Sequence, residues 1–149
     1  MKIGRVLSIM VLVLCAFLMV CCAAQTNTDT AEEFLTNYYT SDYEGRYSSA
    51  SDAQAYGETY DAIFGALVSE DVLESLKANR TPYKYDKLCA EKGVETVVKE
   101  VALEGGGETY TYTVTVDLNG ESVDFSGQIE LDRDGKVSYF HEISNSLAE

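Results

Sequence analysis

The chain contains no tryptophan, a single proline and a single histidine, and its basic residues are few. Lys and Arg number 11 against 25 Asp and Glu, so the formal net charge at pH 7 is −14. Nucleic-acid binding depends on basic side chains that neutralise phosphates, so this deficit argues against a nucleic acid as partner. With one histidine and four cysteines, soft ligands are too few for a zinc site, and we expect neither a metal nor a cofactor.

The rest of the composition is that of a folded domain. The chain is 149 residues long, 46% hydrophobic and 11% aromatic, which is enough to bury one core and too short for two domains of ordinary size. Composition thus predicts one globular domain, but it names no substrate or ligand.

The first residues are typical of an export signal. Lys2 and Arg5 precede a run, residues 6–20, that is apolar except for Ser8. As a helix rising ~1.5 Å per residue, this run covers about 22 Å, less than the ~30 Å hydrocarbon thickness of a bilayer. We therefore expect a signal peptide over residues 1–21 that is removed; a retained membrane anchor is the alternative.

The end of this run, LMVCC, resembles the lipobox of bacterial lipoproteins, in which a cysteine receives diacylglycerol. We favour lipidation at Cys22, which follows the small Cys21, although Met19 replaces the usual leucine. Cys21 is the second candidate, but bulky Val20 precedes it. Ordinary cleavage after Ala24 is a third interpretation and would release a soluble protein.

After the lipobox, residues 22–28 are small and polar and predict a tether between membrane and domain. This places the domain outside the cytoplasm, anchored to the outer face of the cytoplasmic membrane by an N-terminal lipid. The remaining cysteine, Cys89, is expected to be buried and inert; a disulfide with Cys21, Cys22 or another chain is the alternative.

The first half of the domain has helical periodicity. Thr30 and Glu33 form a capping signature, with Asp29 as a rival cap, and the helix should end near Thr40. Ser69 caps a later helix that Pro82 prevents from continuing. The expected helices cover residues 29–40, 52–67 and 69–80, whereas 83–93 is either a short helix or an irregular crossover.

The second half alternates like strands. Asn119-Gly120 is a strong signal for a two-residue hairpin, and it pairs Leu118 with Glu121. Stepping outward by two gives an apolar face of Val116–Val123, Val114–Phe125, Tyr112–Gly127 and Tyr110–Ile129, while the opposite face is polar and rich in threonine. One face is therefore core and the other solvent.

Two more strands are expected. A three-residue loop, 133–135, with a bulge would pair Leu131–Val137, Ile129–Tyr139, Gly127–His141 and Phe125–Ile143. Residues 94–103 form the first strand, which is apolar on both sides and so either bulged or covered on both faces. The predicted fold class is α+β, a single domain over 29–146 with N-terminal helices packed on one face of a curved antiparallel sheet of about four strands.

This order of elements, with the stretches FLTNYYTSDYEGR and GKVSYFHEI, is similar to the NTF2-like superfamily, in particular to small domains on surface lipoproteins of Gram-positive bacteria. The resemblance covers residues 29–146 and implies a cone-shaped fold. It also implies a possible activity, because NTF2-like folds include ketosteroid-isomerase and dehydratase-type enzymes, which use a carboxylate base with tyrosine or acid donors in an apolar cone.

A ligand pocket is one reading of the apolar face. The row Tyr112–Gly127–His141 crosses three strands, and the glycine leaves a gap that is either a pocket floor or is filled by Tyr112. The pocket candidates are Tyr110, Tyr112, Phe125, Gly127, Tyr139 and His141.

Isomerase-type catalysis would need an acid in the cone, and the expected core face contains none. Asp61, Glu95 and Lys99 are the only substitutes, and none is compelling. We therefore predict no catalytic residue and a non-enzymatic domain that binds an envelope protein or a small apolar ligand; a small isomerase or dehydratase-like enzyme is the alternative.

The sequence has 11 tyrosines, and Tyr39, Tyr43 and Tyr47 fall off the helical stripe. Tyrosine favours interfaces because it combines a large contact area with a polar tip, so these three are candidates for a partner surface. The alternative is that they are exposed without a role. The threonine-rich outer face of the sheet is also available for a homodimer.

Overall fold

The computed structural model describes residues 26–50 and 52–144. The expected signal peptide, the candidate lipidation sites Cys21 and Cys22, and most of the tether lie outside these residues. Among the helices of the described ranges, none is both long and apolar enough to cross a membrane.

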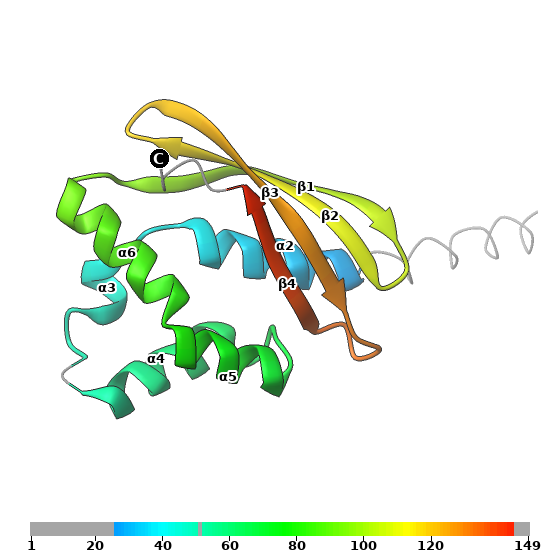
Figure 1. Ribbon diagram of the computed structural model, residues 1–149, viewed down its shortest axis with the longest axis horizontal. Helices are drawn as coiled ribbons and strands as arrows, with labels where there is room; N and C mark the ends of the chain where they lie inside the picture. The colour runs from blue at the N-terminus through cyan, green and yellow to red at the C-terminus, as the bar shows by residue number, and fades with distance from the viewer. Residues whose placement is uncertain (1–25, 51, 145–149) are drawn as a thin grey trace, which may run out of the picture.

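The chain forms helices first and strands afterwards, as an α+β fold (Figure 1). The helices are α2 (Thr26–Tyr39), α3 (Tyr43–Tyr47), α4 (Ala53–Phe64), α5 (Glu70–Asn79) and α6 (Thr81–Lys92). The strands are β1 (Thr96–Gly106), β2 (Thr109–Leu118), β3 (Glu121–Leu131) and β4 (Val137–Ser144). The predicted class and the predicted number of strands are confirmed.

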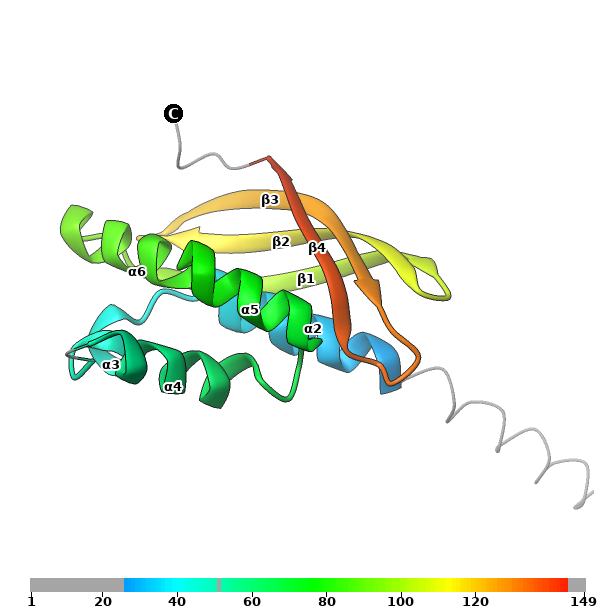
Figure 2. The ribbon, with the colours of Figure 1, turned by 60° about the horizontal axis from the view of Figure 1, so that its bottom comes forward.

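The four strands form one open antiparallel sheet in the order β1-β2-β3-β4. The sheet arches over α2, which lies against its concave face and contacts all four strands (Figure 2). The helices α5 and α6 follow one another alongside α2, and α3 and α4 lie beyond them, away from the sheet. Since the sheet does not close, β1 and β4 are both edge strands.

The central hairpin has the predicted register, with Leu118 opposite Glu121 and Tyr112 opposite Gly127. Asn119 and Gly120 have φ values of 53° and 94°, the positive angles that a type I′ turn requires. The face predicted to be core is buried, including Val114, Phe125 and Ile129. In β1 the register shifts between Val98 and Glu100, so the bulged alternative is the one found.

The register of β4 differs from the prediction. Leu131 does pair with Val137, but an extra residue, Ser138, shifts the pairs that follow by one. A second register shift lies between Ser126 and Gly127, so that Ser126 pairs with Ser144 and the predicted Phe125–Ile143 pair does not form. The bulge at Ser138 turns the side chains from Tyr139 to Glu142 to the face opposite the predicted one. The observed pairs are Glu130–Tyr139, Ile129–Phe140, Gln128–His141 and Gly127–Glu142.

Packing against α2 explains this shift. The Phe140 ring lies 5.1 Å from the ring of Phe34, 4.7 Å from that of Tyr38 and 5.7 Å from that of Tyr112, between centroids. Edge-to-face and stacked contacts of this kind stabilise the inward position of Phe140 beyond the area it buries. In consequence Tyr139 and His141 point to the outer face and are exposed.

The helices differ from expectation in three places. Helix α2 already includes Thr26, so the cap predicted at Asp29 or Thr30 is wrong and the end of the expected tether is helical. The expected loop after Thr40 contains the short helix α3. The ambiguous segment forms α6, which begins with Pro82 in its first turn and ends at Gly93, whose φ is 64°.

The expectation that Tyr39 and Tyr47 are exposed is wrong, because each is only about 1% exposed. Tyr39 is buried because the arched sheet covers a wider arc of α2 than a flat one would, so both Tyr38 and its neighbour face the core. Tyr47, on α3, packs its ring within 5.4 Å of the ring of Tyr83. Tyr43 is half-buried. These three residues therefore do not form an open partner surface.

Candidate functional site

A groove of about 590 Å³ runs between α5 and the edge strand β4. Its sides combine apolar, hydroxyl and acidic groups, so it is not a simple hydrophobic cleft. The lining residues are Tyr38, Asp71, Val72, Ser75, Leu76, Asn79, Thr81, Ser138, Tyr139, Phe140, His141 and Glu142.

The carboxylate of Glu142 is the most organised polar group of this groove. The Tyr39 hydroxyl donates to Glu142 Oε2 at 2.6 Å and lies 2.9 Å from the Tyr112 hydroxyl. Burial, together with the neighbouring Tyr112 and Glu142, raises the pKa of Tyr39 well above its usual value. Burial likewise raises the pKa of Tyr112. Both phenols therefore stay protonated and act as hydrogen-bond donors.

Gly127 allows this arrangement because it leaves room for Tyr112. A Cβ atom at Gly127 would clash with the carbonyl oxygen of His141 and would lie 2.5 Å from the Tyr112 hydroxyl. Of the two interpretations of the gap, the structure shows the second: Tyr112 fills it. Position 127 therefore has no room for a side chain of its own.

The remaining pocket candidates are divided between the two faces. Tyr112, Phe125 and Gly127 are buried on the concave face, and Tyr110 is half-buried. Tyr139 is 43% exposed, and Tyr139 and His141 line the groove between α5 and β4, which the other four candidates do not. The six residues therefore do not line one common cavity.

Glu142 is the residue that the sequence prediction missed. The uniform alternation assumed for β4 placed Glu142 on the outer face, and from this we expected no acid on the core side. The adjacent aromatics Tyr139 and Phe140 compete for one inward position, and this competition was the available sign of a bulge.

The acids and the lysine weighed as substitutes lie elsewhere. Asp61 is exposed and pairs with Lys77 at 2.7 Å, between Oδ1 and Nζ. Lys99 is exposed in the β1 bulge, where it pairs with Asp117, and Glu95 is exposed just before β1. None of these three lines the groove between α5 and β4.

The groove is suited to hold a ligand that donates hydrogen bonds or carries positive charge. Glu142 and Asp71 supply carboxylates, whereas Phe140, Leu76 and Val72 supply apolar contact. Within residues 26–50 and 52–144, no group of three or more His, Cys, Asp or Glu side chains is arranged to hold a metal ion.

Comparisons with known proteins assign no family. No family model matches the chain, and no curated protein matches it. Among solved structures, it is similar to a de novo designed β-sheet protein determined by solution NMR, with 16% identity and a TM-score of 0.45 over 81% of this chain and 90% of that one. The function of the groove and of its Glu142 carboxylate therefore has to follow from the chemistry of its lining residues.

Proposed function

We propose that this chain is a non-enzymatic, lipid-anchored extracytoplasmic domain that binds a segment of an envelope protein in the groove between α5 and β4. The observation that carries the proposal is the open groove of about 590 Å³ beside the outer edge of β4, which pairs only at Val137 among the described residues. The leader with its lipobox-like end supports the location. The helices on a curved sheet are compatible with an NTF2-like cone, which belongs to the same proposal.

The edge of β4 is suited to accept an additional strand. Its first residue already pairs in this way, because Val68 forms a parallel bridge with Val137. The Ser69 amide donates to the Val137 carbonyl and the Val137 amide to the Leu67 carbonyl, both at 2.9 Å. Beyond this bridge the chain turns into α5 and leaves the groove beside β4. An extended peptide would continue the pairing there, as in other cases of strand addition.

Charge favours a cationic segment. Asp71 and Glu142 line the groove, and the whole chain has a net charge of −14. A small apolar ligand, the other occupant considered, is less well supported because Tyr112 fills the gap over Gly127. A lysine or arginine of the bound segment would lie near the Glu142 carboxylate.

The groove is tested with an array of seven-residue peptides, followed by fluorescence anisotropy with those that bind. We expect binding of lysine-containing extended peptides, and loss of binding when their backbone amides are N-methylated, because strand addition needs those amides. Ser75→Trp should fill the groove and weaken peptide binding at least about tenfold. Ser122→Trp, at an exposed position of β3 outside the groove, should leave peptide binding unchanged. Equal binding by both variants would refute the groove as the site.

The anchor is tested by mass spectrometry of the mature N-terminus. We expect a diacylglyceryl-modified Cys22, and we expect Cys22→Ser to abolish the modification. A modified Cys21 would shift the site by one residue. An unmodified N-terminus at Gln25 would instead support cleavage after Ala24 and a soluble protein.

A second candidate function, a small isomerase or dehydratase-like enzyme, is favoured by one observation. The Glu142 carboxylate accepts a hydrogen bond from the Tyr39 hydroxyl, which in turn contacts the Tyr112 hydroxyl. A carboxylate base near phenol donors is the kind of group set used for proton abstraction next to a carbonyl. Deuterium exchange at the α-carbon of cyclohexanone, followed by NMR, tests it. Catalysis that Glu142→Gln removes would favour the enzyme; a rate equal to that of buffer would favour the binding domain.

A further inference from the structure

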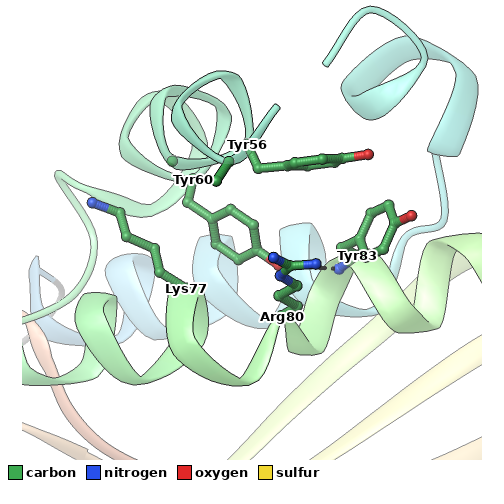
Figure 3. A pocket seen from close by; sticks show the side chains of 7 residues that line it. Tyr56, Tyr60, Lys77, Arg80 and Tyr83 are labelled. Carbon is green, nitrogen blue, oxygen red and sulfur yellow. Dashed lines mark hydrogen bonds between the residues drawn. The ribbon is translucent and has the colours of Figure 1, made fainter. Parts of the chain in front are cut away.

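A second pocket lies on the other side of the helices, between α4 and the junction of α5 with α6 (Figure 3). Its volume is about 160 Å³. Tyr56 and Tyr60 enter from α4, Tyr83 from α6, Lys77 from α5 and Arg80 from the junction itself. The pocket thus combines three aromatic rings with two cationic side chains, in a chain that is otherwise strongly acidic.

Arg80 is held in an unusual conformation at this place. Its φ of 52° and ψ of 40° are left-handed, a conformation that residues other than glycine adopt at a cost. This single residue ends α5 and starts α6, and its side chain turns into the pocket beside Tyr60 (Figure 3). Across the described ranges, Arg80 makes no ion pair, whereas Lys77 pairs with Asp61 at 2.7 Å.

The tyrosines form fixed walls. The ring of Tyr56 meets that of Tyr83 edge-on, with 5.0 Å between the centroids. Tyr60 is about 1% exposed, and its hydroxyl accepts a hydrogen bond from the Tyr83 amide at 3.3 Å. All three tyrosines thus have partners within the fold that hold their rings in place, including the ring of Tyr47.

Gly57 keeps the space between these walls open. It lies inside α4 and lines the pocket, and a Cβ atom at this position would have no heavy atom within 4 Å. Glycine weakens a helix interior, and no neighbouring atom excludes a Cβ at this position. Packing within the fold therefore does not explain why glycine stands here. A larger side chain at this position would project into the pocket instead.

We propose that this pocket is a binding site for a small aromatic acid, with its ring packed against the tyrosines and its carboxylate on the Arg80 guanidinium. A cavity of about 150 Å³ accommodates a benzene-sized group, which fits the volume observed. The guanidinium offers two parallel N–H donors to a carboxylate, and Lys77, engaged by Asp61, is the secondary contact. The site is separate from the groove beside β4, so either proposal can fail without the other.

Isothermal titration calorimetry of the full chain in lauryl maltoside micelles, with empty micelles as blank, tests the proposal. The probes are benzoate and phenylacetate, with benzamide as the uncharged analogue of the first. We expect saturable binding of the acids and at least about tenfold weaker binding of benzamide, which lacks the charge. Failure of both acids to bind would overturn the proposal.

Variants then locate the site. Arg80→Asn keeps a residue that tolerates the left-handed conformation but removes the guanidinium, so benzoate affinity should fall at least about tenfold. Arg133→Asn, on an exposed turn, removes the same charge elsewhere and should have no effect. An equal loss of benzoate affinity in Arg80→Asn and Arg133→Asn would mean that benzoate is attracted by the overall charge of the protein, and would refute the site.

A third variant, Gly57→Leu, should block the pocket without loss of the fold, which circular dichroism and thermal melting would verify. Binding at wild-type affinity in this variant would place the acid elsewhere.

N-acetyl-phenylalanine distinguishes two sources of an aromatic carboxylate. Binding as tight as that of phenylacetate would indicate the C-terminal residue of a peptide, whereas much weaker binding would indicate a free aromatic acid.

Discussion

The hydroxyl of Tyr39 holds the carboxylate of the groove in place, and Tyr39→Phe removes this hydroxyl alone. Its oxygen lies 2.6 Å from Glu142 Oε2 and 2.9 Å from the Tyr112 hydroxyl. A hydrogen bond to a charged group contributes about 1.5–3 kcal/mol and one between neutral groups about 1 kcal/mol. Glu142 is only half-buried and regains some contact with water from the groove. The expected loss is therefore about 2–3 kcal/mol in the free energy of unfolding.

Urea unfolding at pH 7 measures this loss, and Tyr110→Phe is the matched control. The Tyr110 hydroxyl donates to the Gly107 carbonyl at an exposed site, so its removal should cost less than about 0.5 kcal/mol. At roughly 4 °C per kcal/mol for a domain of this size, Tyr39→Phe should lower the melting temperature by about 8–12 °C.

A double-mutant cycle with Glu142→Gln then assigns the effect to the pair. We expect the double variant to be less destabilised than the sum of the single ones, with a coupling of about 1 kcal/mol or more. The argument is refuted if Tyr39→Phe is as mild as the Tyr110 control, or if the two single effects simply add.

Three further predictions concern residues outside this pair. Burial raises the pKa of Asp86 from 3.8 to about 6, although the nearby positive charge of Arg46 lowers it in part. Between pH 3.8 and about 6 the folded state therefore binds more protons than the unfolded state. Stability should thus fall by at most about 3 kcal/mol as the pH rises from 3.8 to about 6, and Asp86→Asn should abolish this slope in urea titrations. Gly127→Ala should cost about 1–3 kcal/mol, because the added Cβ would clash with the His141 carbonyl oxygen and overpack against Tyr112; thermal melting measures this loss. Gly120→Ala should cost about 1 kcal/mol because φ is 94° there, measured in the same way.

Local patterns were sufficient for the central hairpin. Asn119 and Gly120 fix the turn, and the alternation of apolar and polar residues fixes which side faces the core. Both signals lie within a few residues of the pairs they specify. The register of β2 with β3 was therefore predictable from the sequence in every pair.

The same reasoning failed for β4 and for the site. Alternation alone cannot decide which of two adjacent aromatics turns inward, and here the rings of Phe34 and Tyr38 on α2 select Phe140. This choice moves Glu142 to the concave side, where it meets Tyr39. Tyr39 in turn is buried by the curvature of the sheet, which depends on the packing of all four strands.

The sequence by itself thus determined the class of fold, the strand order along the chain and the central hairpin, because propensity, turn chemistry and alternation act between neighbours in the chain. Tertiary packing alone decided the bulge at Ser138, the contact of Tyr39 with Glu142 and the pocket around Arg80. These features bring together residues that are far apart in the chain, and their positions follow from which side chains fill the space between the helices and the sheet.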